Sequence, residues 1–332
     1  MKNAILALLL IGAAANAGAQ AIAVHGWVDG DCAWNDRHPD SGFNFFSGIG
    51  TTAHRADQLA LNVAALEFAR DPKPFGFHLV LVGGDSADVV HAGEPHPHRH
   101  SVRNVYQASI AYTAPVGRGL ALEAGVYPSH IGFEGFFTKD NWNYTHSLLG
   151  ELSPYYQTGI KASYAWSDRW SGQLHVIRGW QTISDTGSDP SFGTQLAYND
   201  ARLSASLNTF AGPERNLADL VATWKLTPKV SLGTSLDVGA DDDAHWGGLA
   251  AYARYALNDR HAFALRAERF RDPHAGISGF EQTLTEGTFT YEHRPSAHFI
   301  LKFEGRRDHS SAAVFNGSRN QRLAIASIVA TY

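Results

Sequence analysis

The sequence predicts an all-β protein, a closed antiparallel transmembrane β-barrel of about 16 strands. Three observations support this fold class. Apolar and polar residues alternate in short segments along most of the chain, short polar turns alternate with connections that are mostly longer, and the last alternating segment ends in an aromatic residue, Tyr332. A chain that combines these features is typical of barrels in the bacterial outer membrane.

The N-terminal residues have the three parts of a secretory signal peptide. A basic start at Lys2 precedes an apolar run over residues 4–15, and residues 17–19 (Ala-Gly-Ala) form a small-x-small cleavage site. The apolar run is too short to span a bilayer comfortably. We therefore predict cleavage near Ala19, which leaves residues 20–332 as a single barrel domain. The one cysteine, Cys32, excludes an internal disulfide.

Alternation with a period of two residues recurs along the predicted mature chain. Residues 230–238 place Val, Leu, Thr, Leu and Val on one face and Ser, Gly, Ser and Asp on the other. Such a strand has one face in an apolar medium and the other in water. A soluble β-sandwich shows the same alternation, but the predicted strands also reach the length of about 10–12 residues that a tilted strand needs to cross a bilayer.

The alternating segments give 16 predicted strands, an even number that leaves both termini on the periplasmic side. Fourteen is the alternative count, because the third and eighth segments have the weakest patterns. The predicted strands cover residues 21–35, 57–70, 75–83, 103–113, 118–127, 155–166, 169–180, 192–199, 201–211, 217–226, 229–239, 245–257, 261–271, 281–293, 297–308 and 321–332.

The connections and the strand ends predict how the barrel sits in the membrane. Short polar turns are expected to face the periplasm and the longer connections to face outward. The short turns fall at residues 71–74, 114–117, 167–169, 199–201, 227–229, 258–260 and 294–296. Aromatic residues near strand ends are expected to form girdles at the membrane interfaces. These are Trp27, Tyr106, Trp166, Trp170, Trp180, Trp224, Trp246, Tyr255 and Tyr291.

The chain ends in an apolar strand face that is closed by Tyr332. We expect the barrel-assembly machinery of the outer membrane to read this aromatic end as an insertion signal. The protein is therefore expected in the cell outer membrane, with lipid as its surroundings.

Closure of the sheet predicts a pore. Lipid cannot hydrogen-bond a free strand edge, so the sheet must close on itself. A closed sheet of about 16 strands is too wide for side chains to fill and leaves an aqueous channel. We expect passive diffusion of small hydrophilic solutes. The candidate pore-wall residues carry both signs of charge, which argues against a strong ion filter; they are Arg202, Asp237, Arg254, Arg266, Glu268, Lys302, Glu304 and Arg306.

The third outer connection, from Pro128 to Pro154, is long and rich in aromatic and aliphatic residues. A loop of this composition would be poorly placed in water. We expect it to fold into the barrel and narrow it, as the third loop does in general porins; the alternative is a lid packed on the rim. The candidate constriction residues are Glu134, Lys139, Asp140 and Glu151.

Several segments, in this order and spacing, resemble the outer-membrane β-barrel porins of the OmpL-like family. They are Gly125-Val126-Tyr127, Gly132-Phe133-Glu134, the run Asn143-Tyr144-Thr145-His146-Ser147-Leu148-Leu149, Thr158-Gly159, Gly179-Trp180, the run Trp246-Gly247-Gly248-Leu249-Ala250-Ala251-Tyr252, and residues 265–272. The resemblance covers the mature chain and implies an outer-membrane barrel with porin activity and no catalytic residues. Members often have Asn and Arg where this chain has Arg178 and His146, so the local pore charge is open. Analogy with general porins suggests a homotrimer.

A histidine-rich segment lies between the third and fourth predicted strands and contains His91, His96, His98 and His100. Imidazole groups bind Zn²⁺, Cu²⁺ or Ni²⁺. Prolines at 95 and 97 would keep the segment extended, so its histidines need not converge on one ion. The alternative function is therefore a plugged or gated surface receptor that binds metal through this second outer loop.

Other classes of protein do not fit the sequence. The formal net charge is −5 and no long basic run occurs, which argues against a nucleic-acid partner. An outer-membrane phospholipase needs Ser, His and an orienting Asn or Asp on the lipid-facing wall. His146 and Ser147 are adjacent loop residues that cannot face each other, so we expect no enzyme. No cofactor is predicted.

Overall fold

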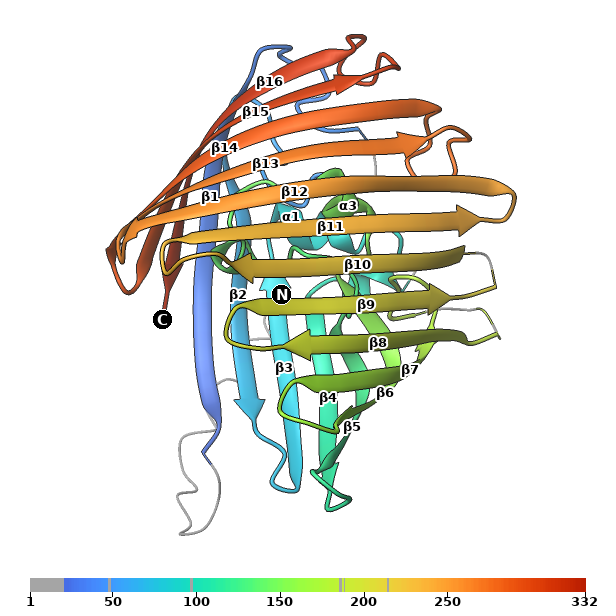
Figure 1. The fold of residues 1–332 in the computed structure, drawn as a ribbon. Coiled ribbons are helices and arrows are strands. Elements are labelled where there is room, and N and C mark those ends of the chain that lie inside the picture. The colour runs from blue at the N-terminus through green and yellow to red at the C-terminus, as the bar shows by residue number, and fades with distance from the viewer. Residues whose placement is uncertain (1–20, 47–48, 96–97, 185–186, 188, 214) are drawn as a thin grey trace, which may run out of the picture.

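The computed structural model describes residues 21–46, 49–95, 98–184, 187, 189–213 and 215–332, and in this part of the chain 16 antiparallel strands form a closed barrel (Figure 1). Each strand pairs with its neighbours in sequence, and the last pairs with the first. The strands are β1 (Ala23–Asn35), β2 (Leu59–Arg70), β3 (Phe75–Gly83), β4 (Val105–Ala114), β5 (Leu120–Pro128), β6 (Tyr156–Ala165), β7 (Trp170–Arg178), β8 (Ser191–Asn199), β9 (Leu203–Ala211), β10 (Arg215–Lys225), β11 (Val230–Asp241), β12 (Ala244–Asn258), β13 (His261–Asp272), β14 (Gln282–Ser296), β15 (Phe299–Ser310) and β16 (Asn320–Thr331).

The barrel closes through an antiparallel ladder between β1 and β16, which places Trp27 opposite Thr331 and Asn35 opposite Leu323. No strand edge of this ladder is left without a partner, as an apolar surrounding requires. The two strands with the weakest sequence patterns both form: β3 pairs with β2 and β4, and β8 pairs with β7 and β9. The prediction of 16 strands is confirmed, and the alternative of fourteen is wrong.

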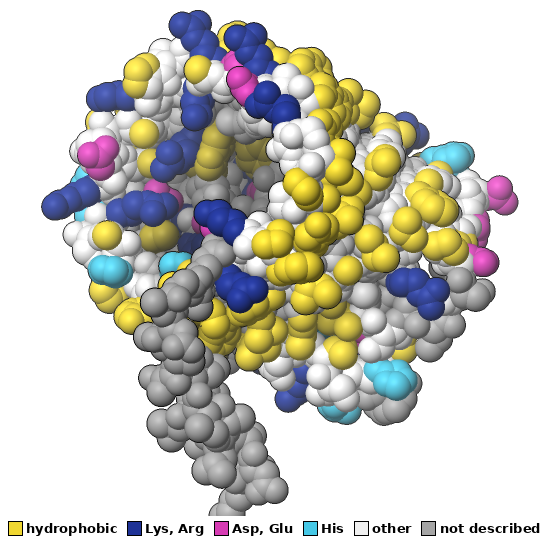
Figure 2. Space-filling view, turned by 90° about the horizontal axis from the view of Figure 1, so that it is seen from below, with side chains coloured by type: hydrophobic (Ala, Val, Ile, Leu, Met, Phe, Trp, Pro, Cys, Tyr) yellow, Lys and Arg dark blue, Asp and Glu magenta, His cyan; other side chains and the backbone are white. Residues whose placement is uncertain are grey.

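Alternation along each strand separates an apolar outer face from a polar inner face. On β13 and β14, Leu265 and Phe289 point outward and are 55% and 49% exposed, whereas Arg266 and Glu286 point inward and are 2% and 5% exposed. Figure 2 shows the result, a band of hydrophobic side chains on the outer wall beside a hollowed opening that Lys and Arg side chains border. A barrel with this surface is suited to a lipid surrounding.

Part of the predicted aromatic girdle is wrong. Trp27, Tyr106 and Trp246 are 6%, 4% and 3% exposed and face the interior. Trp27 contacts Phe137 with ring centroids 4.6 Å apart, and Tyr106 stacks on Phe136 at 4.7 Å. The side chains of these three aromatic residues point into the barrel, so they pack against other residues of its interior rather than against lipid. Trp166, Trp170, Trp224 and Tyr255 are exposed, as a girdle requires.

The connections alternate in length between the two ends of the barrel. Seven short turns lie at one end, at residues 71–74, 115–119, 166–169, 200–202, 226–229, 259–260 and 297–298. We name the outer connections L1 (36–58), L2 (84–104), L3 (129–155), L4 (179–190), L5 (212–214), L6 (242–243), L7 (273–281) and L8 (311–319). L5 and L6 are as short as the turns; L6 closes tightly because Asp242 adopts a positive φ of 49°.

The longer loops carry the helical segments α1 (Asp85–Val90), α2 (Arg99–Val102), the 3₁₀ turn η1 (Thr138–Asp140) and α3 (Leu148–Leu152). None of the helices in the described residues has the length and apolar character needed to cross a membrane. The predicted signal peptide, residues 1–19, lies outside the described residues.

Candidate pore constriction

L3 lies inside the barrel, and most of its side chains are buried. Tyr144, Leu148 and Leu149 are 0%, 1% and 1% exposed. The two leucines belong to a hydrophobic cluster with Phe270 and Leu284 of the barrel wall. The strands that carry L3 approach each other closely at its base, where Gly125 of β5 faces Gly159 of β6. Gly125 has φ 124°, and a side chain there would collide with the backbone of β4, so this position requires glycine.

One lysine of the wall holds the middle of L3. Lys302 of β15 is fully buried, and its Nζ donates hydrogen bonds to the carbonyl oxygens of Thr138, Asn141 and Asn143 at 2.7, 2.6 and 3.3 Å. Three acceptors satisfy the three protons of an ammonium group. This buried cation is therefore bound to the loop backbone and is not presented to the lumen.

Two glutamates of the wall bind the amide groups that follow. Glu304 accepts from the backbone N–H of Tyr144 and Thr145 at 2.6 and 3.0 Å. Glu268 accepts from the backbone N–H of Leu148 and Leu149 at 2.7 and 2.8 Å, where α3 begins. Hydrogen bonds from amides to carboxylates are about twice as strong as those between neutral groups. L3 is thus fixed along β13 and β15.

The arginines of the same wall form a buried ionic network with L3. Arg266 donates to Glu134 of L3 at 2.8 Å and to Glu286 of β14 at 2.6 Å. Arg306 donates to Asp308 at 2.9 Å and to the carbonyl oxygen of His146 at 2.7 Å. The hydroxyl of Tyr144 donates to Asp29 and Asp31 of β1 at 3.1 and 2.9 Å, which extends the network to the seam of the barrel.

A second loop is fastened to L3 by a carboxylate. Glu151 accepts from the backbone N–H of Gly50 and Thr51 in L1 at 2.9 and 3.0 Å, and His146 lies 3.3 Å away. Burial disfavours the charged carboxylate, but hydrogen bonding and charge from His146 and hydrogen bonds from Thr51 outweigh it. The pKa of Glu151 is therefore held below its usual value of 4.5.

The predicted constriction residues divide into two kinds. Glu134 and Glu151 are buried and bound to Arg266 and to L1, as described above. Lys139 and Asp140 lie on η1 and pair with each other at 2.7 Å, and the Asp140 side chain is 62% exposed. The Lys139 ammonium also lies over the Trp27 ring, 4.7 Å from its centroid, so of the four only Asp140 has a largely exposed side chain.

The predicted wall residues also lie in different surroundings. Arg202 is exposed in the turn between β8 and β9 rather than on a strand. Arg254 pairs with Glu292 at 3.1 Å. Asp237 is buried on β11 opposite Asp219 of β10, and Ser153 of L3 donates to it at 3.3 Å. The remaining five, on β13 and β15, bind L3.

The described histidines of L2 form no metal-binding group. His91 is fully buried, and its ring nitrogens lie 2.8 and 3.0 Å from the carbonyl oxygens of Ala87 and Val105. His98 and His100 lie at the start of α2, and His96 is outside the described residues. Among the described residues no group of three His, Cys, Asp or Glu side chains is placed to hold a metal ion.

The side of L3 that faces β8, β9 and β10 borders a recess of 370 Å³. Aromatic side chains line it on the L3 side, and small neutral side chains line it on the wall side. The main members are Phe133 and Trp142 of L3, Tyr252 of β12 stacked on Phe133, and Gln195, Ser206 and Thr223 of β8, β9 and β10. None of these six was among the predicted site residues, because those predictions rested on charge; the alternation that places Ser206 inward was the available signal.

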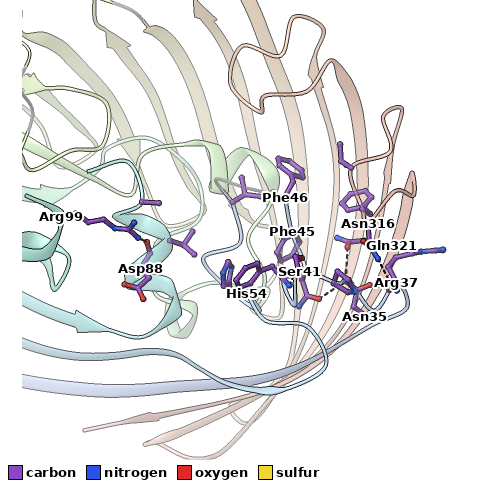
Figure 3. Close-up of a pocket in the computed structure, with 18 residues that line it drawn as sticks. Asn35, Arg37, Ser41, Phe45, Phe46, His54, Asp88, Arg99, Asn316 and Gln321 are labelled. Carbon is purple, nitrogen blue, oxygen red and sulfur yellow. Dashed lines mark hydrogen bonds between the residues drawn. The ribbon is translucent and has the colours of Figure 1, made fainter. Parts of the chain in front are cut away.

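A larger cavity of 560 Å³ lies at the outer end of the barrel between L1, L2 and L8 (Figure 3). In the figure Asp88 and Arg99 of L2 lie across the cavity from Asn316 of L8, with Phe45 and Phe46 of L1 between them. Its lining is mostly apolar and aromatic. The short turns of the barrel lie at the opposite end from this cavity.

A comparison with known protein families assigns this chain to one of them. The profile described as "Putative beta-barrel porin-2, OmpL-like" matches residues 21–332. The chain belongs to this OmpL-like porin family. The resemblance seen in the sequence is thus confirmed, and this porin is an outer-membrane channel through which small solutes diffuse. No curated protein sequence matches it.

Solved structures similar to this porin include a porin, a channel and a further protein of the outer membrane. The anion-selective porin from Comamonas acidovorans has a TM-score of 0.62 at 12% identity, with 95% of this chain and 100% of that chain covered. The outer-membrane channel DcaP of Acinetobacter baumannii has a TM-score of 0.59 at 11% identity, with 96% and 100% covered. OmpT of Vibrio cholerae has a TM-score of 0.60 at 7% identity, with 96% and 99% covered. At sequence identities of 7–12%, the structural similarity establishes the fold alone.

Proposed function

We propose that solutes cross this porin between L3 and the inner face of β8, β9 and β10, by passive diffusion and without catalysis. The observation that carries the proposal is the space left beside L3 on the side of β8, β9 and β10. Charged side chains of β13 and β15 bind the middle of L3, and β8, β9 and β10 hold its start through His130 and Gly132. Beyond these contacts, Gln195, Ser206 and Thr223 border a recess beside the loop. Small hydrophilic solutes suit such a neutral polar wall.

In this proposal the predicted site residues have two roles. Glu134 and Glu151 of L3 bind the wall and L1, and the inward charges of β13 and β15 bind L3, so together they hold the loop in place. Asp140 and Lys139 at η1 contribute the charges of the constriction, because Asp140 remains largely exposed beside the recess. Their opposite signs leave the constriction close to neutral.

Single-channel recording in planar bilayers tests the proposal. Purified, folded porin should give stepwise current increases in KCl, and replacing Thr223 by Trp should lower the step size because the new side chain would occupy the recess. Replacing Val238 by Trp, which places the same bulk on the lipid-facing side of β11, should leave the step unchanged. Folded protein without current steps, or equal steps for the two variants, would contradict the route.

The assembly pathway is a further part of the proposal. Residues 1–19 act as a signal peptide that is removed near Ala19, and Tyr332 presents the chain to the barrel-assembly machinery. Tyr332 is 87% exposed, and its backbone N–H donates to the carbonyl oxygen of Gly26 at 2.8 Å, which keeps it beside β1. Three barrels associate within the lipid. The mature N-terminus and the mass of the native complex, both from mass spectrometry, check the cleavage and the homotrimer.

A further inference from the structure

The recess beside L3 has the composition of a site for a particular class of solute. Phe133 and Tyr252 stack with ring centroids 4.2 Å apart, and Trp142 stands edge-on to Phe133 at 5.5 Å and 85°. Phe133 and Trp142 are only half-buried although they belong to L3, whose other aromatic residues are mostly enclosed. Partly exposed aromatic side chains therefore form one side of the recess.

The opposite side offers hydrogen bonds without charge. The amide of Gln195 donates through Nε2 to Asn208 at 2.9 Å and to the carbonyl oxygen of His130 in L3 at 3.3 Å, which leaves its oxygen available among the bonds of the described residues. The hydroxyl of Ser206 accepts from Asn208 at 3.2 Å, which leaves its own proton free to donate. The wall of the recess thus contains a spare acceptor and a spare donor.

The charges around the recess are already neutralised. The charged side chains in its described lining are Glu134 and Asp140, both acidic. Glu134 is bound by Arg266 at 2.8 Å and by the hydroxyl of Ser147 at 2.6 Å, and Asp140 is paired with Lys139. No lysine or arginine belongs to the described lining, so an anionic solute would find acidic neighbours and no cation of its own to bind.

We propose that this recess recognises neutral, hydroxyl-rich solutes, that is saccharides or polyols, as they pass L3; the inference rests on the proposed route and names its solute class. The C–H face of a sugar ring packs on the negative face of an aromatic ring, and its hydroxyls bond to neutral donors and acceptors. The volume of 370 Å³ lies within the range of about 300–1,000 Å³ of ligand pockets.

Block of the ion current by maltose tests the proposal. Maltose should reduce the current of the full-length mature porin with a saturable concentration dependence. Trp142→Ala should raise the half-blocking concentration about tenfold, as a loss of roughly 1.4 kcal/mol of binding gives. Trp142→Phe should restore most of the block because it keeps an aromatic face. Trp170→Ala removes an exposed tryptophan from the outer surface and should leave the block unchanged.

Two further measurements keep the test decisive. Ser206→Ala removes one hydroxyl without touching L3 and should weaken the block about threefold, which covers the case in which Trp142→Ala does not fold. Gluconate, the carboxylate counterpart of glucose, should block more weakly than glucose. A maltose effect that only follows the conductivity of the solution, and is equal in wild type and Trp142→Ala, would overturn the proposal.

Calorimetry separates this inference from the proposed route. Maltose is titrated into the folded, detergent-solubilised porin, which requires no current. Binding that Trp142→Ala weakens, in a protein that gives no current steps, would refute the route and support the recess. Current steps without saturable block and without calorimetric binding would support the route and refute the recess.

Discussion

At the scale of single residues, the inward charges of the barrel wall act mainly as anchors for a loop. Arg266 shows this most clearly, because it is 2% exposed and lies between Glu134 and Glu286. A buried ion pair of this kind adds little net stability, but removing one partner leaves an uncompensated charge. The effect of a substitution therefore depends on whether the wall charge faces L3 or water.

Arg266→Gln should destabilise the porin by about 3–5 kcal/mol, because Glu134 and Glu286 would remain buried without their cation. The matched control is Arg269→Gln on the same strand, where the side chain is exposed on the outer face. Urea unfolding in lipid vesicles measures both free energies. A loss below about 1 kcal/mol for Arg266→Gln would show that the network does not hold L3.

The contact between L1 and L3 should depend on pH through Glu151. Its folded-state pKa lies below 4.5, so its stabilising effect is fully present above about pH 4.5 and is lost as the pH falls through the lower folded value. Proteolysis of L1 should therefore accelerate in acid. In the Glu151→Gln variant, L1 should be cleaved faster than in wild type at neutral pH, and its cleavage rate should change less on acidification. Wild type and variant with the same pH response would contradict this role.

At the scale of elements, the sequence predicted that L3 enters the barrel but not which of its residues meet the passage. Its aromatic content signalled burial, and burial was observed at Tyr144, Leu148 and Leu149. Glu134 and Trp142 could not be assigned in the same way, because a loop has no period that separates its faces. Whether a residue of L3 is bound depends on contacts with residues more than 100 positions away in the sequence. Glu134 has such a contact with Arg266, whereas Trp142 remains half-exposed.

Lys302→Met should loosen L3 while leaving the barrel intact, because three buried carbonyl groups would lose their donor. We expect larger current fluctuations in the open channel and unchanged heat-modifiable mobility of the folded barrel on gels. Lys229→Met is the control, because Lys229 lies exposed in the turn between β10 and β11. Equal open-channel noise in Lys302→Met and wild type would argue against this anchor.

At the scale of the whole molecule, the strands were predictable because each obeys the two-residue period, and the ladder registers them against both neighbours. β3 and β8 had weak patterns because parts of their inner faces pack against loops inside the barrel. Val80 and Val82 of β3 are 3% and 4% exposed and face inward, and Gly193 of β8 lies against the His130 ring of L3. The same interior packing turned Trp27, Tyr106 and Trp246 away from the predicted girdle. An interior shared by water and loops breaks the simple rule of polar residues inside.

The central claim is that the face of β9 carrying Ser206 lines an aqueous passage while the face carrying Leu207 meets lipid. Single cysteines at these adjacent positions, in a Cys32→Ser background, can be modified by a charged, water-soluble thiol reagent during single-channel recording. Modification at Ser206→Cys should lower the current in discrete steps, and Leu207→Cys should give no change. Equal responses at both positions, or a change at Leu207→Cys alone, would contradict the account.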